Sequence, residues 1–238
     1  MPQSTDRLLL ALDLLQGDRD ARLILADVLD DEGDRALADW ARSGSVKRHR
    51  TLDFVLAVLP HRLTLRLACD YFASSLSRLE EHKISGYMQY ESYQPTLEPL
   101  IVAVQHGSQW ARGEIDDDSF HDHRNAIASV GPWAHGIRDL DLTMQSLHMA
   151  LTYTEIAESE LRSDVAFALH EARQSRDASR KVAKASREIL RPMLATRARL
   201  RLTPPLNRSL QRLDANDILN EQFTQAQNVV AAEVPERT

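Results

Sequence analysis

The sequence predicts an all-α protein in which a small N-terminal helical module is followed by a larger helical array with a long basic C-terminal helix. Leu, Ala, Arg, Asp and Glu dominate the 238 residues, whereas glycine and proline number only 8 and 9. Helices favour this composition. Apolar residues recur at intervals of three and four, as they do along one face of a helix. No segment shows the sustained apolar–polar alternation, bounded by turn residues, that a strand requires.

The first part of the chain is expected to form three short helices. One begins near residue 5 and ends at Gly17, a second occupies about 21–33, and Asp34 caps a third that stops near Gly44. Asp18 or Asp20 can cap the second helix. Helical spacing predicts the inward-facing side chains, which are Leu8, Leu9, Leu12 and Leu15, then Leu23, Ala26, Val28 and Leu29, then Leu37, Trp40 and Ala41.

The second of these helices carries RLILADVLDDEGD at residues 22–34. This segment resembles the repeat-companion domain found in many copies in planctomycete proteomes, whose pattern is similar to R-L-x-Y-A-D-W-L-E-E-x-G-D. Leu25 and Val28 stand at the two aromatic positions. The resemblance covers about residues 5–44 and implies an accessory or adaptor module without an established chemistry. The acids of the segment are interpreted as helix caps and solvated groups, or alternatively as an acidic binding surface, and they are Asp30, Asp31, Glu32 and Asp34.

The larger array is expected to begin after a polar, basic linker at residues 45–50. A short helix from Thr51 to Pro60 and a long one over 61–82 come first, followed by a loop at 83–94 that contains three tyrosines. The segment 96–115 has a single charge in its first fourteen residues. So apolar a helix is expected to lie at the centre of the array.

Three further helices are expected beyond this segment. Asp116, Asp117 and Asp118 can cap one at 119–130, the next spans about 141–162, and the longest starts at Ser163 or Asp164 and reaches about 201 with a break at Pro192. One or two short helices follow between 207 and 232. The expected domains are therefore 1–45, 51–202 and a C-terminal extension at 203–238.

Three short segments of the array carry a second resemblance. They are LPHRL at 59–63, LACD at 67–70 and WARGE at 110–114. Together they resemble a helical family of bacterial proteins proposed to act as immunity proteins in toxin–immunity conflict systems. The resemblance covers about residues 55–175 and implies a helical protein that binds a protein partner. The family is rich in alanine after its R-G-E signature, whereas this chain continues with DDDSFHDHRNAIASVGPW.

The sequence lacks the motifs of the common enzyme classes. There is no P-loop, no dinucleotide fingerprint and no G-x-S-x-G nucleophile elbow. Cys69 is the only cysteine, and its apolar surroundings predict a buried, inert thiol. His121 and His123 diverge by about 200° on a helix, so they cannot hold one metal ion together. We therefore expect a non-enzyme without cofactor or metal, in the cytoplasm, since no secretory signal or membrane-spanning stretch is visible.

Charge is strongly segregated along the chain. Residues 173–212 contain twelve Lys and Arg against two acids, and the rest of the chain has 17 basic and 33 acidic groups. Six of the basic residues are spaced 3, 4, 4, 3 and 4 apart, so on one helix they project within about 60° of one another. We call these six residues the basic stripe: Arg173, Arg176, Arg180, Lys184, Arg187 and Arg191. The opposite side would carry an apolar seam of Ala178, Val182, Ala185, Ile189 and Met193.

Two interpretations of the basic stripe stay open. Carboxylates from elsewhere in the chain can meet it, or it can bind an anionic partner, either an acidic protein or a nucleic acid. No aromatic residue interleaves its basic residues, which disfavours a stacking surface for single strands. For function we expect a non-catalytic interaction protein of immunity or adaptor type. The alternative is a nucleic-acid-binding helical protein that uses residues 173–191.

Overall fold

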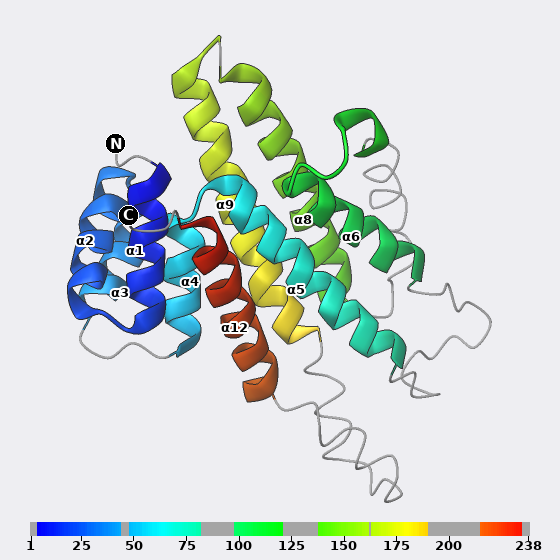
Figure 1. Ribbon diagram of the computed structural model, residues 1–238, viewed down its shortest axis with the longest axis horizontal. Coiled ribbons are helices and arrows are strands. Elements are labelled where there is room, and N and C mark those ends of the chain that lie inside the picture. The colour runs from blue at the N-terminus through cyan, green and yellow to red at the C-terminus, as the bar shows by residue number, and fades with distance from the viewer. Residues whose placement is uncertain are drawn as a thin grey trace, which may run out of the picture. The chain divides into compact units, whose positions relative to one another are not determined.

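The computed structural model describes residues 4–43, 48–81, 98–120, 138–161, 163–189 and 215–234, and within these ranges it contains no strand. The helices (Figure 1) are α1 (Ser4–Gln16), α2 (Arg19–Asp31), α3 (Arg35–Arg42), α4 (Arg48–Val58), α5 (His61–Glu81), α6 (Glu98–Ala111), α8 (Arg138–Glu160), α9 (Val165–Glu188) and α12 (Ala215–Glu233). The all-α prediction is confirmed. Several expected features lie outside the described residues, namely the loop 83–94, most of the helix 119–130, and residues 190–214 with the break at Pro192.

The helices belong to two compact units that differ from the expected domains. The first unit comprises residues 1–60 together with 219–238, and the second comprises 61–218. The first extends past the expected boundary because α4 packs against α1. Since α4 begins at Arg48, the second half of the expected linker is helical. Most of α12 belongs to the first unit instead of forming a separate extension.

The helix ends of the first unit follow the sequence closely. The Asp18 side chain accepts hydrogen bonds from the backbone of Asp20 and Ala21, and Asp34 accepts one from the backbone of Leu37 at 3.2 Å. Each cap satisfies an amide that has no partner within its helix. Gly33 follows α2 at φ 81°, a left-handed conformation in which glycine carries little steric penalty.

The inward faces of the first unit differ from the expected ones, because Leu9, Leu12 and Val28 are only partly buried and two further expected residues are exposed. The core is formed by Leu8, Leu10, Ala11, Leu14 and Leu15 of α1, Ala21, Leu25, Ala26 and Leu29 of α2, and Leu37, Ala38 and Ala41 of α3. The prediction was wrong for Leu23 and Trp40, which are 46% and 49% exposed. Helix α2 packs on both α1 and α3, and the face that contains Leu25 is turned toward them. Leu23 lies on the opposite face of α2 and is therefore exposed to solvent. The Arg50 guanidinium lies 4.7 Å from the centre of the Trp40 ring, a cation–π contact outside the core.

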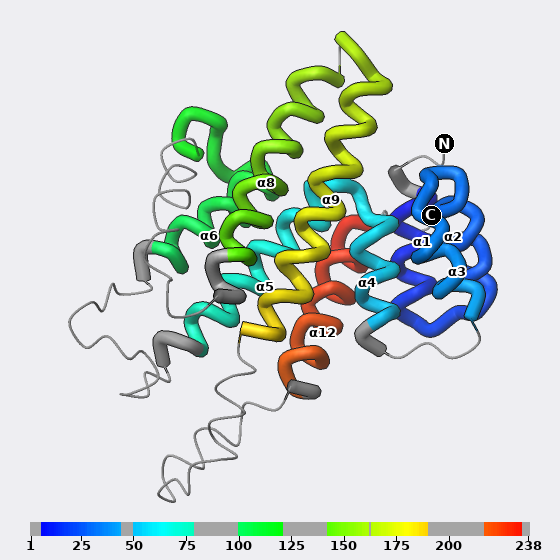
Figure 2. The backbone as a smooth tube through the Cα atoms, turned by 180° about the vertical axis from the view of Figure 1, so that it is seen from behind, coloured from blue at the N-terminus to red at the C-terminus, as the bar shows by residue number. Residues whose placement is uncertain are grey.

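Helix α5 is the centre of the second unit. It packs against α6, α8 and α9, whereas the expected central segment, which forms α6, packs mainly on α5. Figures 1 and 2 show α8 and α9 as an antiparallel hairpin alongside α5. The contact of α5 with α6 is close at Gly107, where an added Cβ would lie 3.2 Å from the Cys69 sulfur. The many buried side chains of α5, including Leu65, Phe72 and Leu76, explain why neighbours cover it on several sides.

Helix α9 follows the expected pattern in its described part. Asp164 caps it by accepting a hydrogen bond from the backbone of Phe167. Of the expected apolar seam, Ala178, Val182 and Ile189 are buried and Ala185 is partly buried, while Met193 lies outside the described residues. The rest of the buried face consists largely of small residues, which are Ala168, Ala172, Ser175, Ser179, Ala183 and Ser186. Small side chains allow neighbouring helices to approach closely.

Candidate interaction surface

The basic stripe does not form an open row of cations along the described part of α9. Four of its residues are partly buried and have contacts within the chain, and they are Arg173, Arg176, Arg180 and Arg187. Arg180 lies 3.2 Å from Asp177 on its own helix. Lys184 is exposed, and Arg191 lies outside the described residues. This burial favours a stripe engaged by the chain over one that is free to bind an anionic partner.

The acidic residues singled out in the N-terminal module are mostly engaged within the first unit. Asp30 is paired with Arg42, Glu32 is paired with Arg7, and Asp34 caps α3. Asp31 is exposed. These contacts agree with the interpretation of the acids as caps and solvated groups more than with a dedicated acidic binding surface.

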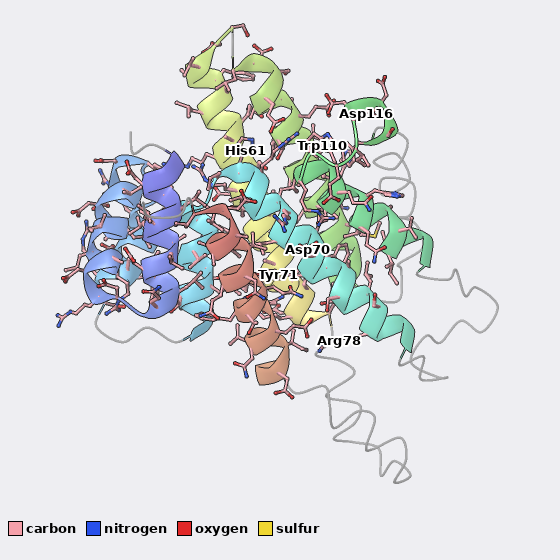
Figure 3. The ribbon with its side chains drawn as sticks, in the orientation of Figure 1. His61, Asp70, Tyr71, Arg78, Trp110 and Asp116 are labelled. Atoms are coloured by element: carbon pink, nitrogen blue, oxygen red, sulfur yellow. The ribbon has the colours of Figure 1, made fainter. Side chains whose placement is uncertain are left out.

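The structure brings together residues from all three anchor segments of the second resemblance. Figure 3 labels His61, Asp70 and Trp110, which come from the beginning of α5, its middle and the end of α6. The Arg62 guanidinium lies 5.0 Å from the centre of the Trp110 ring. Trp110 also stacks on Phe120 with ring centres 4.5 Å apart, and its indole N–H donates to Asp117 at 2.7 Å. The anchors therefore form one polar and aromatic cluster, although up to about fifty residues separate them in the chain.

A partly buried carboxylate, Asp70, joins α5 to α6 within this cluster. Ser108 donates a hydrogen bond to Asp70, and Arg112 donates one to the Ser108 hydroxyl at 2.8 Å. Arg112 also binds Glu114 through two hydrogen bonds of 2.6 and 2.9 Å. Burial raises the pKa of the Asp70 carboxyl above its ordinary value, although the hydrogen bond from Ser108 and the charge of Arg112 oppose this shift. The arrangement holds two helices together, and its charges are compensated within it.

The lone thiol next to this contact is buried, as expected. Cys69 is completely buried in the core of the second unit. Burial is the main cause that raises the pKa of its thiol, and the neighbouring Asp70 charge adds to the effect. Since the reactive form of cysteine is the thiolate, Cys69 is unreactive at neutral pH.

Buried hydroxyl groups connect α9 to its neighbours, a feature that sequence reasoning missed. The hydroxyls of Thr154 and Ser175 lie 2.6 Å apart between α8 and α9, and Ser175 donates to the Ala150 carbonyl. Ser75 of α5 donates to the Ser186 carbonyl at 2.8 Å. The available signal was the helical spacing of Ser175, Ser179 and Ser186 beside the apolar seam. These hydrogen bonds give the packing of α9 a defined register, because an offset would leave buried hydroxyls without partners.

The turn between α8 and α9 exposes a group of large apolar side chains that sequence reasoning also missed. We call the group the hairpin tip, and its members are Leu161, Val165, Phe167 and Leu169, which are 56%, 57%, 45% and 41% exposed. Figures 1 and 2 show the turn reaching beyond the ends of α5 and α6. Exposed apolar side chains are ordinary when scattered, but a group of them is typical of an interaction site.

Comparison with known proteins finds no relative of this chain. No model of a known protein family, no curated protein and no solved structure matches the chain. Over the described residues, no group of three His, Cys, Asp or Glu side chains is placed to hold a metal ion. In that same part of the chain, no helix has the length and apolarity needed to cross a membrane.

Proposed function

We propose that this chain is a non-catalytic interaction protein, of immunity or adaptor type, that acts by binding a protein partner. The observation that carries the proposal is the hairpin tip, where four large apolar side chains within nine residues are 41–57% exposed. Contacts between proteins bury such side chains at their centres, where aromatic and aliphatic residues contribute most of the binding free energy. The two family resemblances of the sequence support the same class of function.

Nucleic-acid binding through the basic stripe has less support. A protein that binds a phosphate backbone needs arginine and lysine side chains that reach solvent. Four stripe residues are partly buried and have contacts within the chain, whereas Lys184 is exposed. In the described part of α9, the stripe is thus better suited to holding the second unit together.

Affinity purification of the tagged chain from its native host tests the proposal. We expect a protein partner that stays bound in a fixed ratio through size-exclusion chromatography and after nuclease treatment. The purified partner should then rebind the purified chain in a calorimetric titration. Co-elution of nucleic acid that disappears on nuclease treatment, with no protein in fixed ratio, would contradict the proposal and favour the nucleic-acid alternative.

A further inference from the structure

We infer that the hairpin tip binds a basic amphipathic segment of a partner protein, with apolar side chains on one side and lysine or arginine beside them. This inference rests on the proposed function and specifies the surface and the chemistry of the partner. It follows from three properties of the tip, which are its apolar exposure, its ordered turn and its negative charge.

The apolar side chains of the tip surround the first turns of α9. Val165 and Leu169 are one helical turn apart and share a side, while Phe167 lies on the other flank of the buried face that contains Ala168 and Ala172. Leu161 adds a fourth side chain from the end of α8. A helix normally turns its large apolar residues toward one neighbour. Here they project on both sides, so helix packing within the unit leaves them uncovered.

The hairpin contacts the first turn of α5 close to the tip. Glu158 of α8 lies 2.7 Å from the Arg62 guanidinium and 3.5 Å from the His61 ring, both in the first turn of α5. Because Ser175 of α9 contacts Thr154 and the Ala150 carbonyl of α8, Leu169 is about level with Glu158, and Leu161, Val165 and Phe167 lie nearer the turn. Helix α5 therefore begins too late to cover the three side chains nearest the turn.

Hydrogen bonds hold Ser163 and Asp164, the described residues that lead into α9. The backbone N–H groups of Ser163 and Asp164 donate to the Glu160 carbonyl at 3.0 and 2.9 Å, and the Ser163 hydroxyl donates to the Glu160 carboxylate. The Asp164 side chain accepts from the backbone of Phe167 at 3.0 Å. A binding surface that is ordered before the partner arrives loses less conformational entropy on association.

Charge identifies the partner that fits this surface. Residues 155–171 contain five carboxylates and one basic residue, Arg162. Glu171 is buried and Glu158 is paired with Arg62, so the acidic groups of the tip itself are Glu160 and Asp164. Asp164, one of the five, is exposed at the turn beside the apolar side chains, and Glu160 is partly exposed. An acidic edge around an apolar group attracts a segment that carries basic side chains next to apolar ones and repels an acidic segment. The basic half of α9 lies farther along the helix, so the tip keeps its negative character.

A pair of model peptides tests this inference on the full-length chain. The probe is a labelled helical peptide of about 18 residues with leucine on one face and lysine on the other. The matched peptide replaces every lysine with glutamate. We expect the lysine peptide to bind in a fluorescence anisotropy titration, with affinity that falls as salt rises, and the glutamate peptide to bind at least about tenfold more weakly.

Variants of the tip separate its apolar and electrostatic contributions. Phe167→Ser combined with Leu169→Ser should weaken binding of the lysine peptide by about tenfold or more. Glu160→Gln combined with Asp164→Asn should weaken binding several-fold and flatten its salt dependence, because both negative charges are removed. The variant should stay folded, since asparagine still caps a helix.

The control variant is Leu142→Ser combined with Met149→Ser, which alters two residues of α8 outside the tip that are 51% and 46% exposed. It should leave the affinity within about twofold. Circular dichroism verifies that each variant is folded.

Four results would overturn the inference. The first is equal binding of both peptides, and the second is an equal loss of affinity in the control pair. The third is self-association in light scattering that only the Phe167 and Leu169 changes abolish, because the tip would then bind a second copy of the chain. A native partner retained at full affinity by the tip variants would also refute the inference, but it would leave the proposed function intact. If the host contains no protein partner at all, the proposed function itself fails.

Discussion

At the scale of single residues, the polar groups of the second unit serve the contact between helices. Asp70 is partly buried between α5 and α6, where it accepts from Ser108 and lies 3.9 Å from Arg112. Its pKa is raised because burial outweighs these two favourable contacts. A carboxylate held in this way tends to oppose folding at neutral pH. The Ser108 hydrogen bond and the Arg112 charge limit this cost without removing it.

The pH dependence of stability should report this burial. The folded chain binds the Asp70 proton more tightly than the unfolded chain, so its contribution to stability is present below the unfolded pKa and is lost as pH rises through the folded pKa. Asp70→Asn, which is neutral at every pH, should therefore be more stable than the native chain at pH 7. The difference should shrink toward about pH 4. Urea unfolding at several pH values measures it.

A second variant provides the control for this pH effect. Ser108→Ala removes the hydrogen bond that most strongly opposes the rise in the Asp70 pKa. The decline of stability with rising pH should then be steeper than in the native chain, with an overall cost of about 1–3 kcal/mol for the lost bond. Parallel pH profiles for the two variants and the native chain would show that another group is responsible.

At the scale of elements, α9 changes character along its length. Its first turns expose Phe167 and Leu169 near an acidic turn, and its later turns alternate a buried face of small residues with arginines that are partly buried. Arg180 pairs with Asp177 on the same helix, and the charge of Arg187 acts on the buried phenol of Tyr71. The first turns of α9 thus expose large apolar side chains, whereas its later turns are packed against neighbouring helices.

Charge reversal along the stripe should distinguish its partly buried members from its exposed member. Arg180→Glu places a second carboxylate next to Asp177 on a partly buried position, and Arg187→Glu puts a negative charge near Tyr71. Each should destabilise the chain by about 1–3 kcal/mol, whereas Lys184→Glu should change stability by less than about 0.5 kcal/mol. Thermal unfolding followed by circular dichroism measures the effects. Equal, negligible effects at all three positions would mean that the stripe is solvated surface.

At the scale of the whole molecule, the chain returns to its first unit at the end. Residues 219–238 belong to the same unit as α1–α4, although the second unit intervenes in the sequence. In α12, Ala226 and Val230 are completely buried, and Phe223 is 6% exposed. Ile218, at the beginning of the same helix, belongs to the core of the second unit. Helix α12 therefore contributes buried side chains to the folded units and is not a separate C-terminal extension.

Hydrogen exchange should detect this return of the chain. Val230→Ala removes buried methyl groups and should destabilise the first unit by about 1–3 kcal/mol. Exchange measured by mass spectrometry should then rise in α1 and α4, because a compact unit opens cooperatively. Gln227→Ala, at an exposed position of α12, is the matched control and should change little. Increased exchange confined to α12 would contradict its assignment to the first unit.

Local chemistry in the sequence determined the helical class and many helix ends. Asp18, Asp34 and Asp164 cap the helices that their positions predicted, and Gly33 follows α2 in a left-handed conformation, because capping depends on a few neighbouring residues. The apolar seam of α9 was also predictable, since its spacing allows only one buried face. The proposed function and the protein partner stay predictions.

Only the tertiary structure decided which faces find neighbours. The spacing of α2 and α3 allowed Leu23 and Trp40 to face inward, yet both are exposed because the adjacent helices cover other sides. In the same way α5 lies at the centre of the second unit in place of the more apolar α6, and the Ser175 hydroxyl and the Ser186 carbonyl of α9 find hydrogen-bond partners on other helices. The hairpin tip is apolar in the sequence like any core segment. Its exposure arises because the hairpin extends past the start of α5, and the relative positions of helices distant in the chain determine that extension.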